Sequence, residues 1–421
     1  MKRPEPHRMP TVIRPTAPQR LADPDNFRDG FPHALFADLR RHTPVVWSEE
    51  ANGPGFWSCL KYEDIATCAR NPAVFSSARE NGGHRIFDEN AVGVGAMGGD
   101  SPIGCPFISR DPPKHTQLRL PVMNVVGPRR LQAMEARIRA RVCGLLDAAP
   151  EGRAFDVVPA VSAPIPIKTL AELLDAPEGS EGKLFEWTNA LIGEDDPEMR
   201  ASPEYMAQAL GELMTFAGAL RSERLSGQGD DLITLISREK DGAKVPLRDF
   251  FANTILVLVG GNETTRNSIS GGLVALARHP EQWERLRADP SLVPTAVSEI
   301  VRWVSPVMHM RRTVMEDVEI RGVTVPKGSK ILFWYPSANR DEDVWPDAFT
   351  FDVGRPAQRH LGFGAGQHVC LGSRLAELQI RIFLEEFLAR FSRVELVGEI
   401  GHIRSNFIDG IKSLPMRFTR A

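Results

Sequence analysis

The sequence lacks any long hydrophobic run. Nowhere among its 421 residues do about 18 consecutive apolar side chains occur, which is the length that crosses a bilayer as a helix. Residues 1–8 are polar and contain prolines, without the apolar segment that marks a secretory signal. We therefore expect a cytoplasmic protein that does not associate with membranes.

Cysteine is scarce and never paired. No two of the five cysteines form a Cys-x-x-Cys spacing, and their number is odd. Such scattered positions fit neither a disulfide framework nor a zinc site, so they indicate a reducing compartment. The cysteines are Cys59, Cys68, Cys105, Cys143 and Cys370.

The chain also lacks an excess of charge of either sign. Its 51 lysines and arginines nearly balance its 54 acidic residues, for a net charge of −3, which gives no basis for nucleic-acid binding by the chain as a whole. It has no internal repeat and no low-complexity linker that would separate two domains. We expect one domain over residues 26–421, preceded by a loosely ordered arm over residues 1–25.

Most of the sequence shows the helical spacing of apolar residues. Shorter runs rich in β-branched and aromatic residues predict strands. The predicted helices cover residues 32–41, 62–70, 128–146, 164–175, 181–194, 203–226, 229–239, 250–278, 283–287, 294–303 and 373–391. The predicted strands cover residues 44–47, 55–60, 309–313, 318–320, 330–334, 394–397 and 415–418.

A glycine-rich stretch without periodicity covers residues 81–107. It contains Gly-x-Gly-x-x-Gly at residues 93–98, but no strand is predicted before it and no helix after it. A dinucleotide site needs both, so this pattern does not support one. A long loop of this kind is typical of a lid or a pocket wall.

Residues 361–372 form the most unusual stretch, Leu-Gly-Phe-Gly-Ala-Gly-Gln-His-Val-Cys-Leu-Gly. Three glycines within five residues predict a tight loop, because glycine adopts positive φ without strain. The loop leads from Cys370 into a predicted helix that begins at Ser373. At this position the helix dipole and the free backbone N–H groups favour a thiolate. Taken alone, a cysteine after a glycine-rich turn is more often structural than a ligand.

A second unusual stretch lies inside the long apolar helix, where residues 260–265 read Gly-Gly-Asn-Glu-Thr-Thr. Two glycines weaken a helix by about 1 kcal/mol each relative to alanine, and the Thr264 hydroxyl can bond to a backbone carbonyl and open the turn. The pattern predicts a groove where a small molecule such as O₂ lies beside an alcohol, Thr264, and a carboxylate, Glu263. The alternative is a polar residue turned to solvent, or a helix crossing at small residues.

The pattern Phe-x-x-Gly-x-His-x-Cys-x-Gly over residues 363–372 resembles the haem-binding signature of the cytochrome P-450 family, with every fixed position filled. The resemblance implies a mostly α fold shaped as a triangular prism, with a smaller β portion near the N-terminus. It implies heme b (iron protoporphyrin IX) as the cofactor and Cys370 as the iron ligand. Phe363, His368 and Gly372 would contact the haem.

The same resemblance assigns roles within the long helix. Residues 260–265 look like the oxygen-activation motif of the family, in which Thr264 is the hydroxyl and Glu263 the acid that supply protons. Gly260 would lie against the haem. Many relatives carry Asp where Glu263 stands, which is a conservative change.

The two haem propionates need positively charged partners. His115 and Arg119 lie four residues apart on one face of a predicted helix that starts after Asp111. From this spacing alone they form either an anion clamp or a solvated basic face. The resemblance implies that they bind the propionates together with Arg312 and His368.

Glu299 and Arg302 are three residues apart on a predicted helix, where their side chains can meet. An exposed pair of this kind would contribute little to stability. In the family that the chain resembles, Glu-x-x-Arg is a buried pair joined by a basic residue before the cysteine loop, and Arg355 matches that residue. The implied role of all three is a scaffold that holds the cysteine loop.

The resemblance implies a monooxygenase that inserts one oxygen atom of O₂ into a C–H bond of a small hydrophobic substrate. It also implies a monomer of the bacterial type, which receives electrons from a ferredoxin with an NAD(P)H-dependent reductase. Arg129, Arg130 and Arg374 are candidates for the basic face that such a partner needs. Two other classes remain, a peroxide-driven peroxygenase and a non-catalytic haem-binding sensor. Neither needs the pair Glu263 and Thr264, which counts against both.

The substrate pocket is expected to be mostly apolar, which favours an aliphatic substrate. Residues 259–268 and 309–313 are similar to those of bacterial alkane and fatty-acid omega-hydroxylases, and residues 405–412 to those of steroid and terpenoid oxidisers. We expect terminal hydroxylation of a medium or long alkyl chain or fatty acid, with a steroid or terpenoid as the alternative. Pocket walls are expected from residues 93–107, 184–210, 255–264, 305–308 and 406–407.

Overall fold

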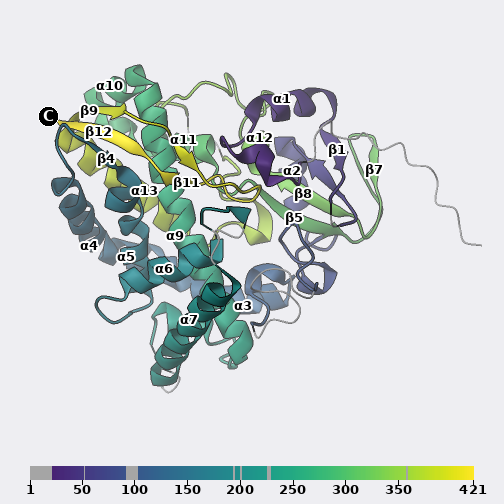
Figure 1. Ribbon diagram of the computed structural model, residues 1–421. Coiled ribbons are helices and arrows are strands. Elements are labelled where there is room, and N and C mark those ends of the chain that lie inside the picture. Colours follow the sequence, from purple (N-terminus) through teal and green to yellow (C-terminus); the bar gives the residue numbers. More distant parts are fainter. Residues whose placement is uncertain are drawn as a thin grey trace, which may run out of the picture.

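The computed structural model places most of its helices on one side and a mixed helix–sheet region on the other (Figure 1). It describes residues 21–51, 53–91, 103–192, 195–199, 202–224, 229–356 and 359–421. The Gly-x-Gly-x-x-Gly stretch at residues 93–98, and with it most of the expected lid, lies outside these described residues. None of the described helices is long and apolar enough to cross a membrane.

Helices make up most of the fold, as expected from the periodicity. The longest is α9, Leu247–Arg278, which runs through the middle of the molecule (Figure 1). The other α-helices are α1 His33–His42, α2 Tyr62–Ala69, α3 Lys114–Met123, α4 Pro128–Asp147, α5 Pro164–Leu173, α6 Glu181–Ile192, α7 Pro203–Arg224, α8 Leu232–Ile236, α10 Pro280–Ala288, α11 Val293–Val304, α12 Tyr335–Ala338 and α13 Ser373–Arg390.

The largest sheet joins strands from both halves of the chain. Its five strands have the order β1-β2-β8-β5-β3, and β2 and β8 run parallel while the other pairs are antiparallel. Strands near the N-terminus therefore pair with strands that follow α11. The five are β1 Val45–Ser48, β2 Phe56–Cys59, β3 Phe75–Ser76, β5 His309–Val314 and β8 Lys330–Trp334.

The remaining strands form small antiparallel sheets. A three-stranded sheet has the order β4-β12-β9, so the C-terminal strand β12 pairs with β4, which lies between α4 and α5 in the chain. Two further pairs are β6 with β7 and β10 with β11. These strands are β4 Ala154–Asp156, β6 Val318–Ile320, β7 Val323–Val325, β9 Phe391–Leu396, β10 Gly401–His402, β11 Ile411–Ser413 and β12 Pro415–Arg420.

Helix α9 is the centre of the main hydrophobic core. Its C-terminal half approaches α11 closely because Gly271 and Gly272 carry no side chain: a Cβ atom would lie 2.7 Å from Val304 at the first position and 3.0 Å from Ile300 at the second. The result is one continuous core between α9, α11, α13 and the three-stranded sheet. The cysteine loop, residues 361–372, enters α13 at the edge of this core.

The packed part of the chain begins nearer the N-terminus than the sequence suggested. The loose arm was expected over residues 1–25, of which residues 1–20 lie outside the described residues. Leu21 is fully buried, in a small core with Phe27 and Trp334, whose rings stack 5.8 Å apart. The packed chain therefore includes Leu21, and the boundary of the arm at residue 25 stays a prediction.

Several helix boundaries differ from the prediction: α9 begins three residues earlier, at Leu247, and α10 covers Pro280–Ala288 instead of residues 283–287. The helix expected at residues 229–239 is limited to Leu232–Ile236, because Arg238 forms a β-bridge with Lys244 instead of continuing the helix. Helix α5 ends at Leu173, before Asp175, which has a positive φ of 49°. The coarse order of helices and strands is otherwise as predicted.

Candidate functional site

The cysteine loop is a tight turn that only glycine could form. Gly364 and Gly366 have φ values of 71° and 69°, in the left-handed region. A Cβ atom on Gly366 would lie 2.0 Å from the carbonyl oxygen of Ala69, so the loop packs directly against the end of α2. The backbone N–H of Cys370 donates to the Phe363 carbonyl at 2.8 Å, which closes the loop. The predicted loop is confirmed.

The environment of Cys370 does not by itself favour a thiolate. Its side chain keeps solvent-accessible surface, but enough protein surrounds the sulfur to raise the pKa of the thiol by desolvation. The backbone N–H groups at the start of α13 and the charge of Arg119 lower this pKa by less. The N–H groups at the helix start therefore lower the pKa of Cys370 as expected, but in the protein without cofactor they do not outweigh desolvation.

The four basic residues expected to bind the propionates come together beside Cys370. The rings of His115 (α3) and His368 (cysteine loop) are 4.2 Å apart, and Arg119 donates to the carbonyl of Val369. Arg312 (β5) is 3% exposed and lies 5.6 Å over the ring of Phe333. Desolvation, followed by the charges of Arg119 and Arg312, lowers the pKa of His115 to about 4.

This basic cluster lacks a negatively charged partner among the described residues. Neither nitrogen of His115 has a hydrogen-bond partner, nor does Nε2 of His368. Desolvation lowers the pKa of Arg312 as well. Buried cations and unpaired polar nitrogens are costly, so this arrangement fits an anionic ligand. A haem, with its two propionates, would satisfy the cluster.

The glycines assigned to haem contact also leave room for a ring. A Cβ atom on Gly260 or Gly372 would meet no other atom within 4 Å. Gly260 lies on α9, four residues before Thr264, and Gly372 lies directly before α13, two residues after Cys370. The open positions are therefore close in sequence to the two residues expected to face the iron. The residues present therefore fit the cofactor that the sequence pattern implied.

Thr264 bonds to its own helix. Its hydroxyl donates to the carbonyl oxygen of Gly260 at 2.8 Å, the competing bond that the sequence predicted. Helix α9 nevertheless continues without a break through this turn. Thr264 is half-buried, so its hydroxyl remains accessible to a bound ligand.

Glu263 is held in a buried ion pair that the sequence reasoning missed. Its side chain is 1% exposed and contacts the guanidinium of Arg266, which is 2% exposed. Arg266 also reaches Asn189 of α6 at 3.5 Å. Desolvation raises the pKa of Glu263. The i, i+3 spacing of Glu263 and Arg266 was the available signal. The Glu263 carboxylate bonds to Arg266 and not to the Thr264 hydroxyl, so the proton-supplying role of Glu263 requires a change in its side-chain position.

Glu299, Arg302 and Arg355 form the expected ion-pair group. The Glu299 carboxylate lies 2.7 Å from Arg302 and 3.2 Å from Arg355. Arg302 also donates to the carbonyl oxygens of Asn339 and Ala348, at 2.7 and 3.0 Å. The contacts are confirmed, whereas the role in holding the cysteine loop stays a prediction.

Asn339 is a link to the cysteine loop that no sequence pattern indicated. Its side-chain oxygen accepts a hydrogen bond from the backbone N–H of Leu361 at 2.7 Å, and its amide donates to Ser305 at 2.7 Å. Since Arg302 bonds to the Asn339 carbonyl, one chain of contacts runs from Glu299 to the first residue of the loop. Asn339 is fully buried.

Two of the predicted pocket-wall segments lie side by side. The backbone N–H of Met308 donates to the carbonyl of Phe407 at 2.9 Å, and Val307 forms a β-bridge with Ile408. Of the expected wall at residues 93–107, residues 93–102 lie outside the described residues.

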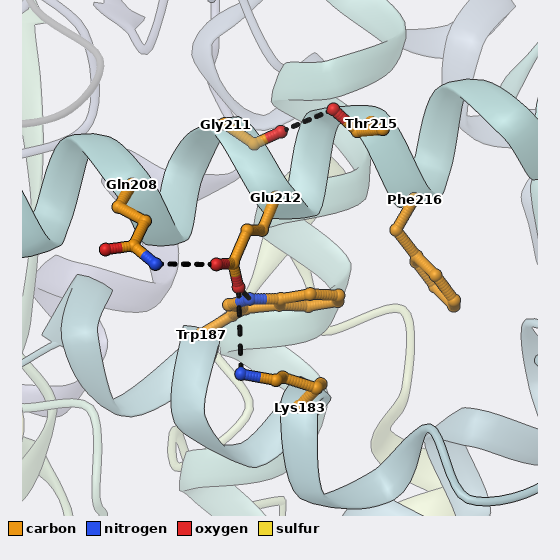
Figure 2. Close-up of a pocket in the computed structure, with 7 residues that line it drawn as sticks. All are labelled: Lys183, Trp187, Gln208, Gly211, Glu212, Thr215 and Phe216. Atoms are coloured by element: carbon orange, nitrogen blue, oxygen red, sulfur yellow. Dashed lines mark hydrogen bonds and ion pairs between the residues drawn. The ribbon is translucent and has the colours of Figure 1, made fainter.

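A groove between α6 and α7 is a separate feature (Figure 2). Its apolar wall is formed by Trp187 and Phe216, and the Glu212 carboxylate accepts bonds from Trp187 at 3.0 Å and Gln208 at 2.8 Å. Neither Cys370 nor Thr264 lines it. Of its lining, Trp187 and Gln208 belong to the predicted wall at residues 184–210, but the groove is not the site beside the cysteine.

Comparisons with known proteins agree with this geometry. The Cytochrome P450 family model matches residues 167–399. Linalool 8-monooxygenase of Pseudomonas putida is 51% identical over 395 residues, which are 94% of this chain and 97% of the relative. The methyl-branched lipid omega-hydroxylase of Mycobacterium tuberculosis is 36% identical over 407 residues, 94% of this chain and 92% of the relative. A Mycobacterium marinum cytochrome P450 in complex with pseudoionone superposes with a TM-score of 0.87 at 31% identity, covering 96% of this chain and all of that one (100%).

Proposed function

The chain belongs to the cytochrome P450 family, and from this premise we propose that it hydroxylates the end of a medium or long alkyl chain. It is a haem-thiolate monooxygenase. The observation that carries the assignment of its site is the basic cluster of His115, Arg119, Arg312 and His368 beside Cys370. The cluster has no acidic partner among the described side chains.

Heme b is the proposed form of the cofactor. Cys370 would ligate the iron, the basic cluster would bind the propionates, and Gly260, Phe363 and Gly372 would line the ring. When bound, the haem activates O₂ for insertion into a C–H bond. Iron would also overcome the raised pKa of the Cys370 thiol, because a ligating cysteine must lose its proton.

Thr264 and Glu263 are proposed to manage protons beside the haem. The Thr264 hydroxyl donates its single proton to the Gly260 carbonyl, so its oxygen can accept a hydrogen bond from a water, and it can donate toward a ligand only by leaving Gly260. Glu263 would have to leave Arg266 to exchange protons with that water. Desolvation of this carboxyl raises its pKa, which brings it nearer to the range in which a carboxylic acid can deliver a proton.

The relatives support two substrate classes. One acts on methyl-branched lipid at the omega position, which favours the alkyl-chain end that we propose. The other is a linalool 8-monooxygenase, and its 51% identity favours a terpenoid as the second candidate. A screen of acids, alkanes, terpenoids and steroids separates the two candidates.

A ferredoxin with an NAD(P)H-dependent reductase is the proposed electron source. Arg129 and Arg374 are exposed and can meet an acidic partner. Arg130 is less available, because it is half-buried and pairs with Asp230 at 3.2 Å. Replacing Arg374 with Glu is expected to slow reduction of the haem, with a smaller effect at high salt.

Reduced–carbon monoxide difference spectroscopy tests the site. A band near 450 nm supports cysteine thiolate ligation; its absence from folded, haem-loaded protein contradicts the assignment. A reconstituted reaction with ferredoxin and reductase then tests the activity. Product formed with peroxide but not with the reductase would indicate a peroxygenase, and no product with any substrate would indicate a haem-binding sensor.

Thr264→Ala tests the proton-management role. We expect the variant to consume reductant at a similar rate but to release a larger share of it as hydrogen peroxide, because the hydroxyl that directs protons is gone. The measurement is product formed per NADH oxidised. Thr265→Ala, one residue further along the helix, is the control. Unchanged coupling in Thr264→Ala would show that the hydroxyl has no such role.

A further inference from the structure

Residues 79–91 form a rigid loop around one buried carboxylate. Glu89 is 3% exposed, accepts bonds from the backbone N–H groups of His84 and Arg85 at 2.8 and 3.2 Å, and pairs with the His84 ring at 2.7 Å. Gly83, with φ of 84°, is needed here, because a Cβ atom would lie 2.1 Å from the Glu89 carboxyl carbon. The backbone at Arg85 is therefore fixed.

Other cations attach this loop to the five-stranded sheet. Arg311 donates to the carbonyl of Phe87 at 2.8 Å, and the backbone N–H of Arg311 donates to the His84 carbonyl at 2.9 Å. Lys330 donates to the Ile86 carbonyl at 2.7 Å and to Glu50 at 2.6 Å. Both cations thus donate side-chain hydrogen bonds to acceptors within the protein, although Nε of Arg311 has no partner.

Arg85 differs from these neighbours. Its guanidinium lies 4.2 Å from the ring centre of Phe407 and 5.0 Å from that of Phe87. Its Nε is buried without a hydrogen-bond partner. The guanidinium forms no hydrogen bond or ion pair with any residue in the described part of the chain, and the side chain is half-buried. A cation covered by two aromatic rings and left without an acceptor calls for a ligand.

The position of Arg85 connects it to the substrate wall. Phe407 belongs to a predicted wall segment, and its carbonyl accepts the backbone N–H of Met308 from another. His309, the next residue on the strand, is fully buried, packs 5.5 Å from the Phe407 ring and has no partner for either ring nitrogen. Desolvation and then the charge of Arg85 lower its pKa to about 3, so His309 is neutral near neutral pH. Arg85 is thus the group that can supply positive charge beside Phe407.

We propose that Arg85 binds the carboxylate of an alkyl-chain acid substrate, a specificity role that rests on the proposed hydroxylation of an alkyl-chain end. The guanidinium suits this ligand because its planar fork can donate two parallel hydrogen bonds to a carboxylate. The two phenylalanine rings hold the fork in place and exclude water from its faces. With the acid held at Phe407, the opposite end of the chain is the part free to reach Cys370 and Thr264.

Calorimetric titration of the haem-loaded protein with dodecanoic acid and with 1-dodecanol tests this role. The two ligands share the chain and differ in the charged group. Arg85→Met keeps the apolar contact with the rings and removes the charge, and Arg85→Lys keeps the charge without the fork. Arg153→Gln, at an exposed arginine before β4, is the control.

We expect the wild type to bind the acid more tightly than the alcohol. In Arg85→Met the Kd for the acid should rise about tenfold or more, and that for the alcohol less than about twofold. Arg85→Lys should fall between, and Arg153→Gln should match the wild type. Equal losses for acid and alcohol, unchanged acid binding in Arg85→Met, or no acid binding by the wild type would each overturn the proposal.

A second readout separates this proposal from the proposed function. All variants should retain the carbon monoxide band near 450 nm, and Arg85→Met should shift the oxidation of dodecanoic acid away from the chain end. A missing band or no turnover of any substrate by the wild type contradicts the monooxygenase site itself. An intact band and turnover, with the same site of oxidation in wild type and Arg85→Met, contradicts only the role of Arg85.

Discussion

Two groups of charged and polar side chains are linked to opposite ends of the cysteine loop, one through Asn339 to Leu361 and one through Arg119 to Val369, and they differ in whether their hydrogen bonds are satisfied. Around Glu299, the carboxylate meets Arg302 and Arg355, and Arg302 also donates to two carbonyls. Around His115, the basic side chains lie beside one another without a carboxylate among the described residues, and three histidine ring nitrogens have no partner. The first group is satisfied by the chain alone, whereas the second is satisfied only when an anion joins it.

Whether a charged group is satisfied by the chain alone indicates whether it serves the fold or the binding of a ligand. A satisfied ion-pair group contributes to a unique fold whether or not a ligand is present. An unsatisfied basic cluster lowers the free energy of unfolding of the cofactor-free protein, and this free energy rises again when an anionic ligand binds. Substitutions in the two groups should therefore respond differently to the cofactor.

The largest effect is expected from the residue between the two groups. Cys370→Ser should remove the band near 450 nm and reduce turnover at least ~1,000-fold, about 4 kcal/mol of transition-state stabilisation. The folding of the cofactor-free protein should change little, because Cys370 keeps accessible surface. Turnover with the reductase system and thermal unfolding are the measurements. Turnover within tenfold of the wild type would show that Cys370 is not the iron ligand.

Breaking the satisfied group should cost stability with and without cofactor. Arg302→Met leaves the buried Glu299 carboxylate without its bidentate partner, which destabilises a fold by about 3–5 kcal/mol. Urea unfolding of the cofactor-free and haem-loaded proteins should give a similar loss in both. Arg355→Met, which removes a more peripheral partner, should cost less. A loss confined to the haem-loaded form would place Arg302 in the ligand-dependent group instead.

Rules of residue spacing predicted the turns and side-chain contacts that depend only on residues close together in the sequence. The turn at Gly364 and Gly366 was predictable because positive φ favours glycine, and the Glu299–Arg302 contact because i, i+3 side chains meet on a helix. The same rule would have paired Glu263 with Arg266. That pair was overlooked because Glu263 had already been assigned a proton role by resemblance.

Other features depend on contacts between distant segments, which no local pattern encodes. Asn339 holds Leu361, 22 positions later in the chain, and no motif surrounds it. Leu21 is buried because Trp334 lies beside it in space. Desolvation raises the pKa of the Cys370 thiol, and a helix-start rule does not include it because it depends on how the whole chain packs. The fold class was thus predictable from the sequence, and the balance of electrostatic effects at Cys370 was not.

The unsatisfied cluster should make the cofactor-free protein sensitive to acid. The native pKa of His115 is lowered to about 4, below the unfolded value of about 6.5. The unfolded state therefore binds more protons between these values, so stability is lost as pH falls from about 6.5 to about 4, by at most about 3 kcal/mol for this residue. Haem propionates would stabilise protonated His115, so the loaded protein should lose less. Denaturant unfolding at several pH values measures both forms. His115→Phe should abolish this part of the difference, and an unchanged difference would contradict the assignment.

The smallest effect is expected where two adjacent arginines of β5 are compared. Arg311 and Arg312 are both buried, but the Arg311 side chain donates to the carbonyls of Phe87 and Asn81 in another segment, whereas the Arg312 side chain donates to the carbonyl of the adjacent Arg311. Arg311→Met leaves buried carbonyls unpaired and should destabilise the cofactor-free protein by about 1–3 kcal/mol. Arg312→Met removes an uncompensated cation, so it should leave that form unchanged or stabilise it by about 1 kcal/mol, while it weakens haem binding about tenfold.

Unfolding of the cofactor-free protein and the rate of haem transfer to apomyoglobin measure the two effects separately. The pair is informative because strand, burial and substitution are matched, and only the partner differs. If Arg312→Met destabilised the cofactor-free protein as much as Arg311→Met, Arg312 would belong with the satisfied group, and the basic cluster would consist of His115, Arg119 and His368 alone.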